Sequence, residues 1–147
     1  MARAYDFANF SVRAFPIMHE LRNPYIFGGV KVLVNVSTKK YSLRMRWALR
    51  RLGIKWYHFP MEEFPEMDVE SLLSAVSVLE QADKKGEKVI LHCMFGNNRS
   101  RTVAEAFYFR KYGHHLEDPY KDSSNHLIYN CTNHHLPALG DMEGLLR

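Results

Sequence analysis

The sequence predicts an α/β domain with a central, largely parallel sheet of four to five strands flanked by helices. Short β-branched segments alternate along the chain with segments of helical periodicity. Strands that alternate with helices are typical of a parallel sheet. In addition, one apolar segment leads directly into a cysteine, and a glycine-bearing loop and a helix follow it. Because sites in such sheets form beyond the carboxyl ends of the strands, we expect the chemistry there.

Residues 30–59 predict two strands with a helix between them. Val30 to Val36 is β-branched and nearly continuous, which suits a buried strand. Ser42 to Leu52 places apolar side chains at helical spacing with arginines on the other face, and Gly53 closes this helix. Ile54 to Phe59 is the next expected strand. Aromatic residues and prolines recur through the first 28 residues, which therefore predict short strands and turns.

The second half of the predicted sheet leads to the candidate site. Pro60 to Met67 is a loop with two prolines, after which Asp68 is placed to cap a helix of clear apolar periodicity. Gly86 ends this helix. Lys88 to His92 is a short apolar strand, and a further helix is expected over Ser100 to Tyr112.

Composition indicates a globular protein that forms a single domain over residues 1–147. Of the 147 residues, 46% are hydrophobic and 24% are charged, and no apolar run reaches the roughly 18 residues of a membrane span. The N-terminus lacks the apolar core of a secretory signal, so we expect a cytoplasmic protein. Two cysteines are too few for a disulfide framework, so we expect a reducing compartment or a chemical role for a cysteine.

The net charge of +4 suits anionic partners. Nucleic acid is disfavoured, because no aromatic-basic RNA motif or zinc-finger spacing accompanies the charge. The amphipathic pattern favours a solvated face for the following basic residues: Arg44, Arg46, Arg50, Arg51, Arg101 and Lys111.

The segment between the last predicted strand and helix is the candidate active site. It reads His92, Cys93, Met94, Phe95, Gly96, Asn97, Asn98, Arg99 and Ser100. Backbone N–H groups of such a loop can point inward, and the following helix adds the positive end of its dipole. Gly96 permits a sharp loop, and the asparagines tolerate the left-handed conformation. Residues 94–99 are therefore the expected phosphate-binding site.

Cys93 and Arg99 have complementary roles in this interpretation. Arg99 can hold two phosphate oxygens at once through its planar guanidinium, which a lysine cannot do. A helix N-terminus and a nearby cation lower the pKa of a thiol, so Cys93 is expected to be reactive as the thiolate. The arginine, the loop amides and the helix dipole together balance the phosphate charge, and no cofactor or metal is needed.

The loop resembles the signature of the protein tyrosine phosphatase superfamily, which is His-Cys, five residues, then Arg-Ser or Arg-Thr. The matching residues are His92, Cys93, Gly96, Arg99 and Ser100. The short chain and the stretch Val32 to Ser37 resemble the small dual-specificity branch. The resemblance covers roughly residues 25 to 112, and the loop is its specific part.

The resemblance implies a two-step reaction through a phosphocysteine intermediate. Cys93 would be the nucleophile, and Arg99 would bind the equatorial phosphate oxygens. Ser100 would donate a hydrogen bond to the sulfur and ease its departure in the second step. His92 would order the loop and help to keep the thiol ionised, without contacting substrate.

The general acid departs from the family pattern. Members of the family carry an aspartate on a separate loop before the cysteine, and by register Glu63 stands at this place. Glutamate has the right chemistry with one extra methylene, and an acid of this kind contributes about 10²–10⁴-fold to the rate. Asp68 is the alternative, although it also stands where the next helix needs an N-cap. Glu62 and Glu66 are expected to face solvent.

The C-terminal segment is rich in histidine, but its spacing does not predict a metal site. The candidate ligands form one loose cluster: His126, Cys131, His134 and His135. Zinc sites repeat a closely spaced pair of ligands at a distance, and no second pair is present. We therefore expect a packed or surface tail.

The sequence favours a phosphomonoesterase for phosphotyrosine, with phosphoserine and phosphothreonine as further candidate groups. The partner is then a phosphorylated protein or a small phosphate ester. The resemblance makes an inositol lipid less favoured, because family members that act on such lipids often carry basic residues in this loop and no lysine occurs between Met94 and Asn98. Two alternatives stay open: a pseudophosphatase that binds phosphate without turnover, and a phosphatase for a nucleotide or an RNA 5′ end. Rhodanese-like sulfur transfer fits Arg99 and Ser100 less well.

Overall fold

The computed structural model describes residues 5–7, 10–62, 68–94 and 99–112, and its centre is a five-stranded sheet. The strand order is β1-β2-β5-β3-β4. β1 (Tyr5–Phe7) is antiparallel to β2 (Phe10–Arg13). β2, β5 (Lys88–His92), β3 (Val30–Asn35) and β4 (Lys55–His58) run parallel to one another. The expected largely parallel sheet is confirmed.

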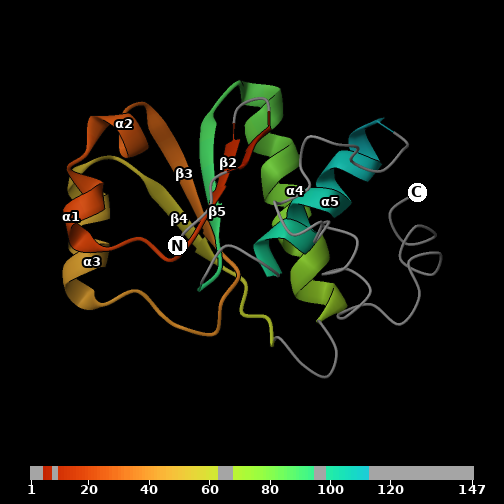
Figure 1. Ribbon diagram of the computed structural model, residues 1–147, viewed down its shortest axis with the longest axis horizontal. Helices are drawn as coiled ribbons and strands as arrows, with labels where there is room; N and C mark the ends of the chain where they lie inside the picture. Colours follow the sequence, from red (N-terminus) through yellow and green to blue (C-terminus); the bar gives the residue numbers. More distant parts are fainter. Residues whose placement is uncertain (1–4, 8–9, 63–67, 95–98, 113–147) are drawn as a thin grey trace, which may run out of the picture.

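Helices cover both faces of the sheet (Figure 1). Three lie on one face: α1 (Met18–Leu21), α2 (Pro24–Phe27) and α3 (Leu43–Arg51). The other face is covered by α4 (Val69–Lys85) and α5 (Arg99–Tyr112). No helix of the described ranges is long and apolar enough to cross a membrane.

The core follows the alternation of side chains along the central strands. Leu33 and Ile90 face the layer of α1, α2 and α3, where they pack with Leu49. Val34 and Leu91 face α4 and α5. Because successive side chains of a strand point to opposite faces, nearly continuous apolar strands are needed to fill both layers. This explains why residues 30–36 read as an almost unbroken apolar run.

Caps define the ends of the two longest predicted helices before the site. The Ser42 hydroxyl accepts a hydrogen bond from the Met45 N–H at the start of α3. Asp68 caps α4 by accepting from the Ser71 N–H, so the expected N-cap is confirmed. Gly86 ends α4 in the left-handed conformation with φ of 69°.

The N-terminal part departs from the expectation of strands and turns alone, because it also forms α1 and α2. Each has only four residues, which is too short for a periodic pattern. Local capping defines them instead: Glu20 accepts from the Ile17 N–H, and Asn23 caps a helix that begins at Pro24.

A second departure concerns α5. The expected solvated face for Arg101 is wrong, since this residue is 1% exposed and Glu105 is also buried. The helix is buried on every side between Arg99 and Phe107. The amphipathic pattern predicted a solvated face for Arg101, but α5 has no exposed side in this stretch. Lys111 is exposed as expected, and it pairs with Asp83.

Candidate active site

The carboxyl ends of the four parallel strands lie in one row. Arg13, His92, Asn35 and His58 are register partners across β2, β5, β3 and β4. Cys93 follows directly after β5. The structure thus places the cysteine at the edge where parallel sheets form their sites.

Cys93 and Ser100 lie side by side across the candidate loop. The Cys93 side chain is 2% exposed, and its Sγ atom is 3.2 Å from the Ser100 Oγ atom. Ser100 is the second residue of α5 and is fully buried. A hydroxyl at this distance can donate a hydrogen bond to a thiolate. Phe95, Gly96, Asn97 and Asn98, expected to bind phosphate, lie outside the described residues.

Arg99 begins α5 as a buried guanidinium. It is 6% exposed, and its Nη1 atom donates to the Met61 carbonyl oxygen at 3.1 Å. Its Nε atom has no hydrogen-bond partner within the described part of the chain. A buried cation with an unused donor is poorly solvated by the protein, so an oxyanion is the complementary ligand.

His92 is held between two hydrogen bonds. Its Nδ1 atom is 3.1 Å from the Cys93 carbonyl oxygen, and its Nε2 atom contacts the Tyr41 hydroxyl. Since a carbonyl can only accept, the proton belongs on Nδ1, and Tyr41 donates to Nε2. The Phe15 ring packs edge-on against the imidazole, with centroids 4.8 Å apart.

This environment makes His92 neutral. Burial lowers the pKa of its imidazole to about 3, although the hydrogen bond to the Cys93 backbone opposes the shift. Burial also raises the pKa of Tyr41 well above its usual range, so the hydroxyl keeps its proton. A neutral imidazole supplies no positive charge to the thiolate. Its Nδ1 atom contacts the Cys93 carbonyl oxygen, and the expected role of His92 in ordering the loop stays a prediction.

A polar network holds residues 35–41 near this edge. Asn35 Oδ1 accepts from the backbone and the hydroxyl of Ser37, and Asn35 Nδ2 donates to the Lys39 carbonyl at 2.7 Å. His58 Nε2 donates to the Ser37 carbonyl at 2.7 Å. These bonds fix the loop that ends at Tyr41, and so they help to place its hydroxyl against His92.

The first residue of the candidate loop after the cysteine is also anchored. The Phe15 N–H donates to the Met94 carbonyl at 3.0 Å. Met94 is half-buried. Segments from the N-terminal region and from the β3–α3 loop therefore both hold the start of the candidate phosphate loop.

The candidate general acids lie on the chain that follows β4. Met61 is fully buried in the core below α4 and α5, and its carbonyl contacts Arg99. Glu62 is exposed as expected, whereas Glu63 lies outside the described residues. Asp68 is exposed, and its Oδ1 atom is 3.2 Å from the Ser71 nitrogen. The acid role stays a prediction for both residues.

Sequence reasoning missed three residues that shape this site: Phe15, Tyr41 and Met61. Each acts on a residue far away in the chain, and two of them act through a backbone atom that is the same in every residue type. One feature of the sequence could have pointed to Tyr41, because this aromatic residue directly precedes Ser42, the N-cap of α3. The histidine-rich segment lies outside the described residues.

Three comparisons relate this chain to known proteins. The family model for the dual specificity phosphatase catalytic domain matches residues 25–130. A probable dual specificity protein phosphatase, the H1 homolog of Fowlpox virus, is 37% identical over 85 residues, which are 57% of this chain and 46% of that protein. The chain spans less than half the length of the curated relatives it matches.

Solved structures share the fold at low sequence identity. Tk-PTP in its active form superposes with a TM-score of 0.62 at 22% identity, over 94% of this chain and 88% of its own. PTPMT1 in complex with PI(5)P superposes with a TM-score of 0.69 at 14% identity, over 95% of this chain and 93% of its own.

Proposed function

This chain belongs to the dual-specificity phosphatase family, and we propose that it is a cysteine-dependent phosphomonoesterase. Its substrate is phosphotyrosine in a protein, with phosphoserine and phosphothreonine as further groups it hydrolyses. The observation that carries the proposal is the arrangement at the start of α5. Cys93 Sγ lies 3.2 Å from Ser100 Oγ, and Arg99 is a buried cation whose Nε atom has no hydrogen-bond partner among the described residues.

In the first step, the Cys93 thiolate attacks phosphorus in line with the ester oxygen. The P–S bond forms and the P–O ester bond breaks. Arg99 holds the equatorial oxygens, where negative charge is spread in the transition state. The leaving oxygen takes a proton from Glu63, and Asp68 is the alternative donor. The product is the free alcohol or phenol, with phosphocysteine on the enzyme.

In the second step, water attacks the phosphocysteine and gives a proton to the carboxylate formed in the first step. The P–S bond breaks, inorganic phosphate leaves, and the sulfur departs as a thiolate. Ser100 donates a hydrogen bond to this sulfur and stabilises its developing charge. His92 keeps the Cys93 carbonyl in place through its Nδ1–H group, which is a positioning role.

The runner-up is a module that binds phosphate groups without hydrolysis. It fits a chain in which no acid reaches the leaving oxygen. Turnover of an activated aryl phosphate separates the two functions, because para-nitrophenolate leaves readily even without a general acid.

The test measures para-nitrophenyl phosphate hydrolysis by the full chain and by Cys93→Ser, both in chelator. We expect turnover by the wild type and none above background by the variant. Phosphotyrosine and phosphoserine peptides of matched sequence, assayed for released phosphate, then rank the substrate groups. A folded wild type that binds phosphate but hydrolyses none of these esters would replace the phosphatase with the binding module.

A further inference from the structure

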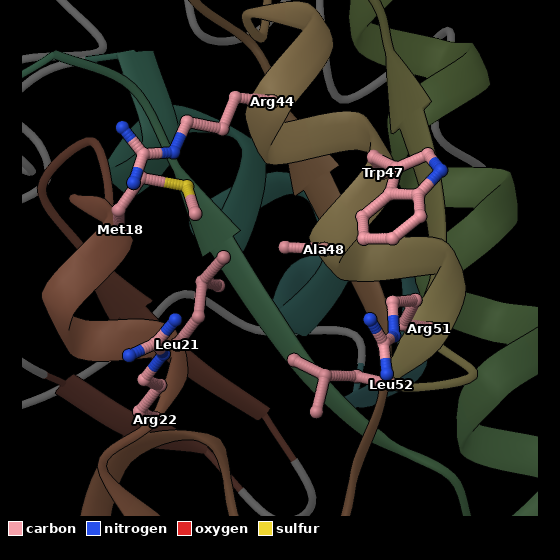
Figure 2. A pocket seen from close by; sticks show the side chains of 8 residues that line it. All are labelled: Met18, Leu21, Arg22, Arg44, Trp47, Ala48, Arg51 and Leu52. Atoms are coloured by element: carbon pink, nitrogen blue, oxygen red, sulfur yellow. The ribbon is translucent and has the colours of Figure 1, made fainter.

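A groove of about 390 Å³ lies between α1 and α3, on the face of the sheet away from α4 and α5. Figure 2 shows its walls, with Met18, Leu21 and Arg22 on one side and Trp47, Arg51 and Leu52 on the other. The volume lies in the range of sites that hold a small ligand or a few side chains. Cys93 packs with the core of α4 and α5, so the groove is separate from the candidate active site.

Large apolar side chains in this groove are open to water. The Trp47 side chain is 61% exposed and Leu52 is 52% exposed. The Arg51 guanidinium lies over the Trp47 ring, 4.9 Å from its centroid. Tryptophan and arginine are among the side chains most enriched at the positions that contribute most of the binding energy in interfaces. Among the described residues, Trp47 and Leu52 do not belong to the core cluster of this layer, which includes Met45 and Leu49.

The charge of the groove is positive and unbalanced. Arg22, Arg44 and Arg51 line it, and no carboxylate of the described residues pairs with any of them. α3 contains four arginines and no acidic residue. Arg44 lies in the first turn of α3, where the helix dipole disfavours a cation. The acid of α1, Glu20, is engaged by the Ile17 N–H.

We propose that this groove binds an acidic segment of a partner protein, in which a large apolar side chain stands between carboxylates. The apolar side chain enters the hollow against Met18 and Trp47, and the carboxylates pair with Arg44 and Arg51. The apolar residues line a hollow rather than a flat patch, which suits a protruding peptide side chain better than the plane of a bilayer. Where the partner is also the phosphorylated substrate, the groove adds to substrate selection, and this clause rests on the proposed function.

The test selects phage-displayed random dodecapeptides on the full chain and measures their affinities by fluorescence anisotropy. Two variants weaken the groove: the double charge reversal Arg44→Glu with Arg51→Glu, and Trp47→Ala. The matched control is Arg46→Glu with Arg50→Glu. It changes the net charge equally on the same helix, one site in each half, but neither residue lines the groove.

We expect the selected peptides to carry Asp or Glu around a large apolar residue. Affinity should fall about tenfold or more in both groove variants, as for truncated interface anchors, and far less in the control. Circular dichroism and para-nitrophenyl phosphate turnover should match the wild type in all variants. If the wild type binds these peptides but hydrolyses no ester, the proposed function fails and the docking site stands.

Several results would overturn the docking site. These are selection of peptides without acidic residues, equal loss of affinity in the control, or no enrichment at all. Binding to phosphatidylcholine vesicles that contain phosphatidylserine, lost only in the groove variants and without peptide binding, would assign the groove to a membrane surface. Self-association that only the groove variants abolish would assign it to a second copy of the chain.

Discussion

Replacing Ser100 with alanine should slow the second chemical step and leave the first nearly unchanged. The wild-type hydroxyl lies 3.2 Å from the Cys93 sulfur. The sulfur loses its charge when it attacks phosphorus and regains it when phosphate leaves. A hydrogen bond to a charged group is worth about 1.5–3 kcal/mol. Since about 1.4 kcal/mol corresponds to a factor of ten in rate, hydrolysis of the intermediate should slow about 10- to 150-fold.

The assay is stopped-flow hydrolysis of para-nitrophenyl phosphate. Ser100→Ala should release a burst of para-nitrophenol close to the enzyme concentration, followed by a slow steady state. Ser100→Thr keeps a hydroxyl and should restore most of the steady-state rate. Ser100 is fully buried at the start of α5, so urea unfolding serves as the control for stability. A slow steady state without a burst would contradict this role of Ser100, because the first step would then be the one affected.

Three further predictions concern the acid and the support of the loop. Glu63→Gln should slow the hydrolysis of esters with poor leaving groups far more than that of para-nitrophenyl phosphate. Asp68→Asn keeps a good N-cap, and it should slow the hydrolysis of both kinds of ester equally or not at all. The reverse pattern would assign the acid role to Asp68. Tyr41→Phe leaves the buried His92 Nε2 atom without its donor and should cost about 1–3 kcal/mol in urea unfolding, and an unchanged midpoint would argue against the bond. The pKa of His92 is about 3 in the folded protein, whereas the ordinary value for a histidine is 6.5. Between pH 3 and pH 6.5 the unfolded chain therefore binds more protons than the folded chain. The contribution of neutral His92 to the free energy of unfolding is fully present above pH 6.5, and it falls by up to about 1.4 kcal/mol per pH unit below this pH. His92→Gln should flatten this dependence of stability on pH. An equally steep dependence in the variant would contradict the lowered pKa of His92.

The central elements could be predicted from the sequence because their signals are local. β5 runs over Lys88–His92, as its apolar run predicts. α4 begins after Asp68 and ends before Gly86, since a capping carboxylate and a left-handed glycine both leave clear marks. By contrast, α1 and α2 depend on single capping contacts within four-residue segments, and no periodic pattern can reveal them.

In the candidate site, only contacts between residues close together in the sequence could be predicted. The hydrogen bond between Cys93 and Ser100 was expected from the family resemblance of the loop, and the two residues lie only seven positions apart in the chain. The contact of Tyr41 with His92 joins residues 51 apart, and that of Met61 with Arg99 joins residues 38 apart. Such contacts follow from the order of strands in the sheet, which places β3, β4 and β5 side by side. The neutral state of His92 likewise depends on burial, which spacing does not contain.

Trapping of the phosphocysteine intermediate is the direct test of nucleophilic attack by Cys93. A radiolabelled phosphotyrosine peptide is mixed with the full chain in chelator, the reaction is quenched within milliseconds, and the labelled enzyme is digested and sequenced. We expect label on the peptide that contains Cys93, no label in Cys93→Ser, and more label in Ser100→Ala than in the wild type. Release of phosphate without covalent label, or label that survives Cys93→Ser, would contradict nucleophilic attack by Cys93.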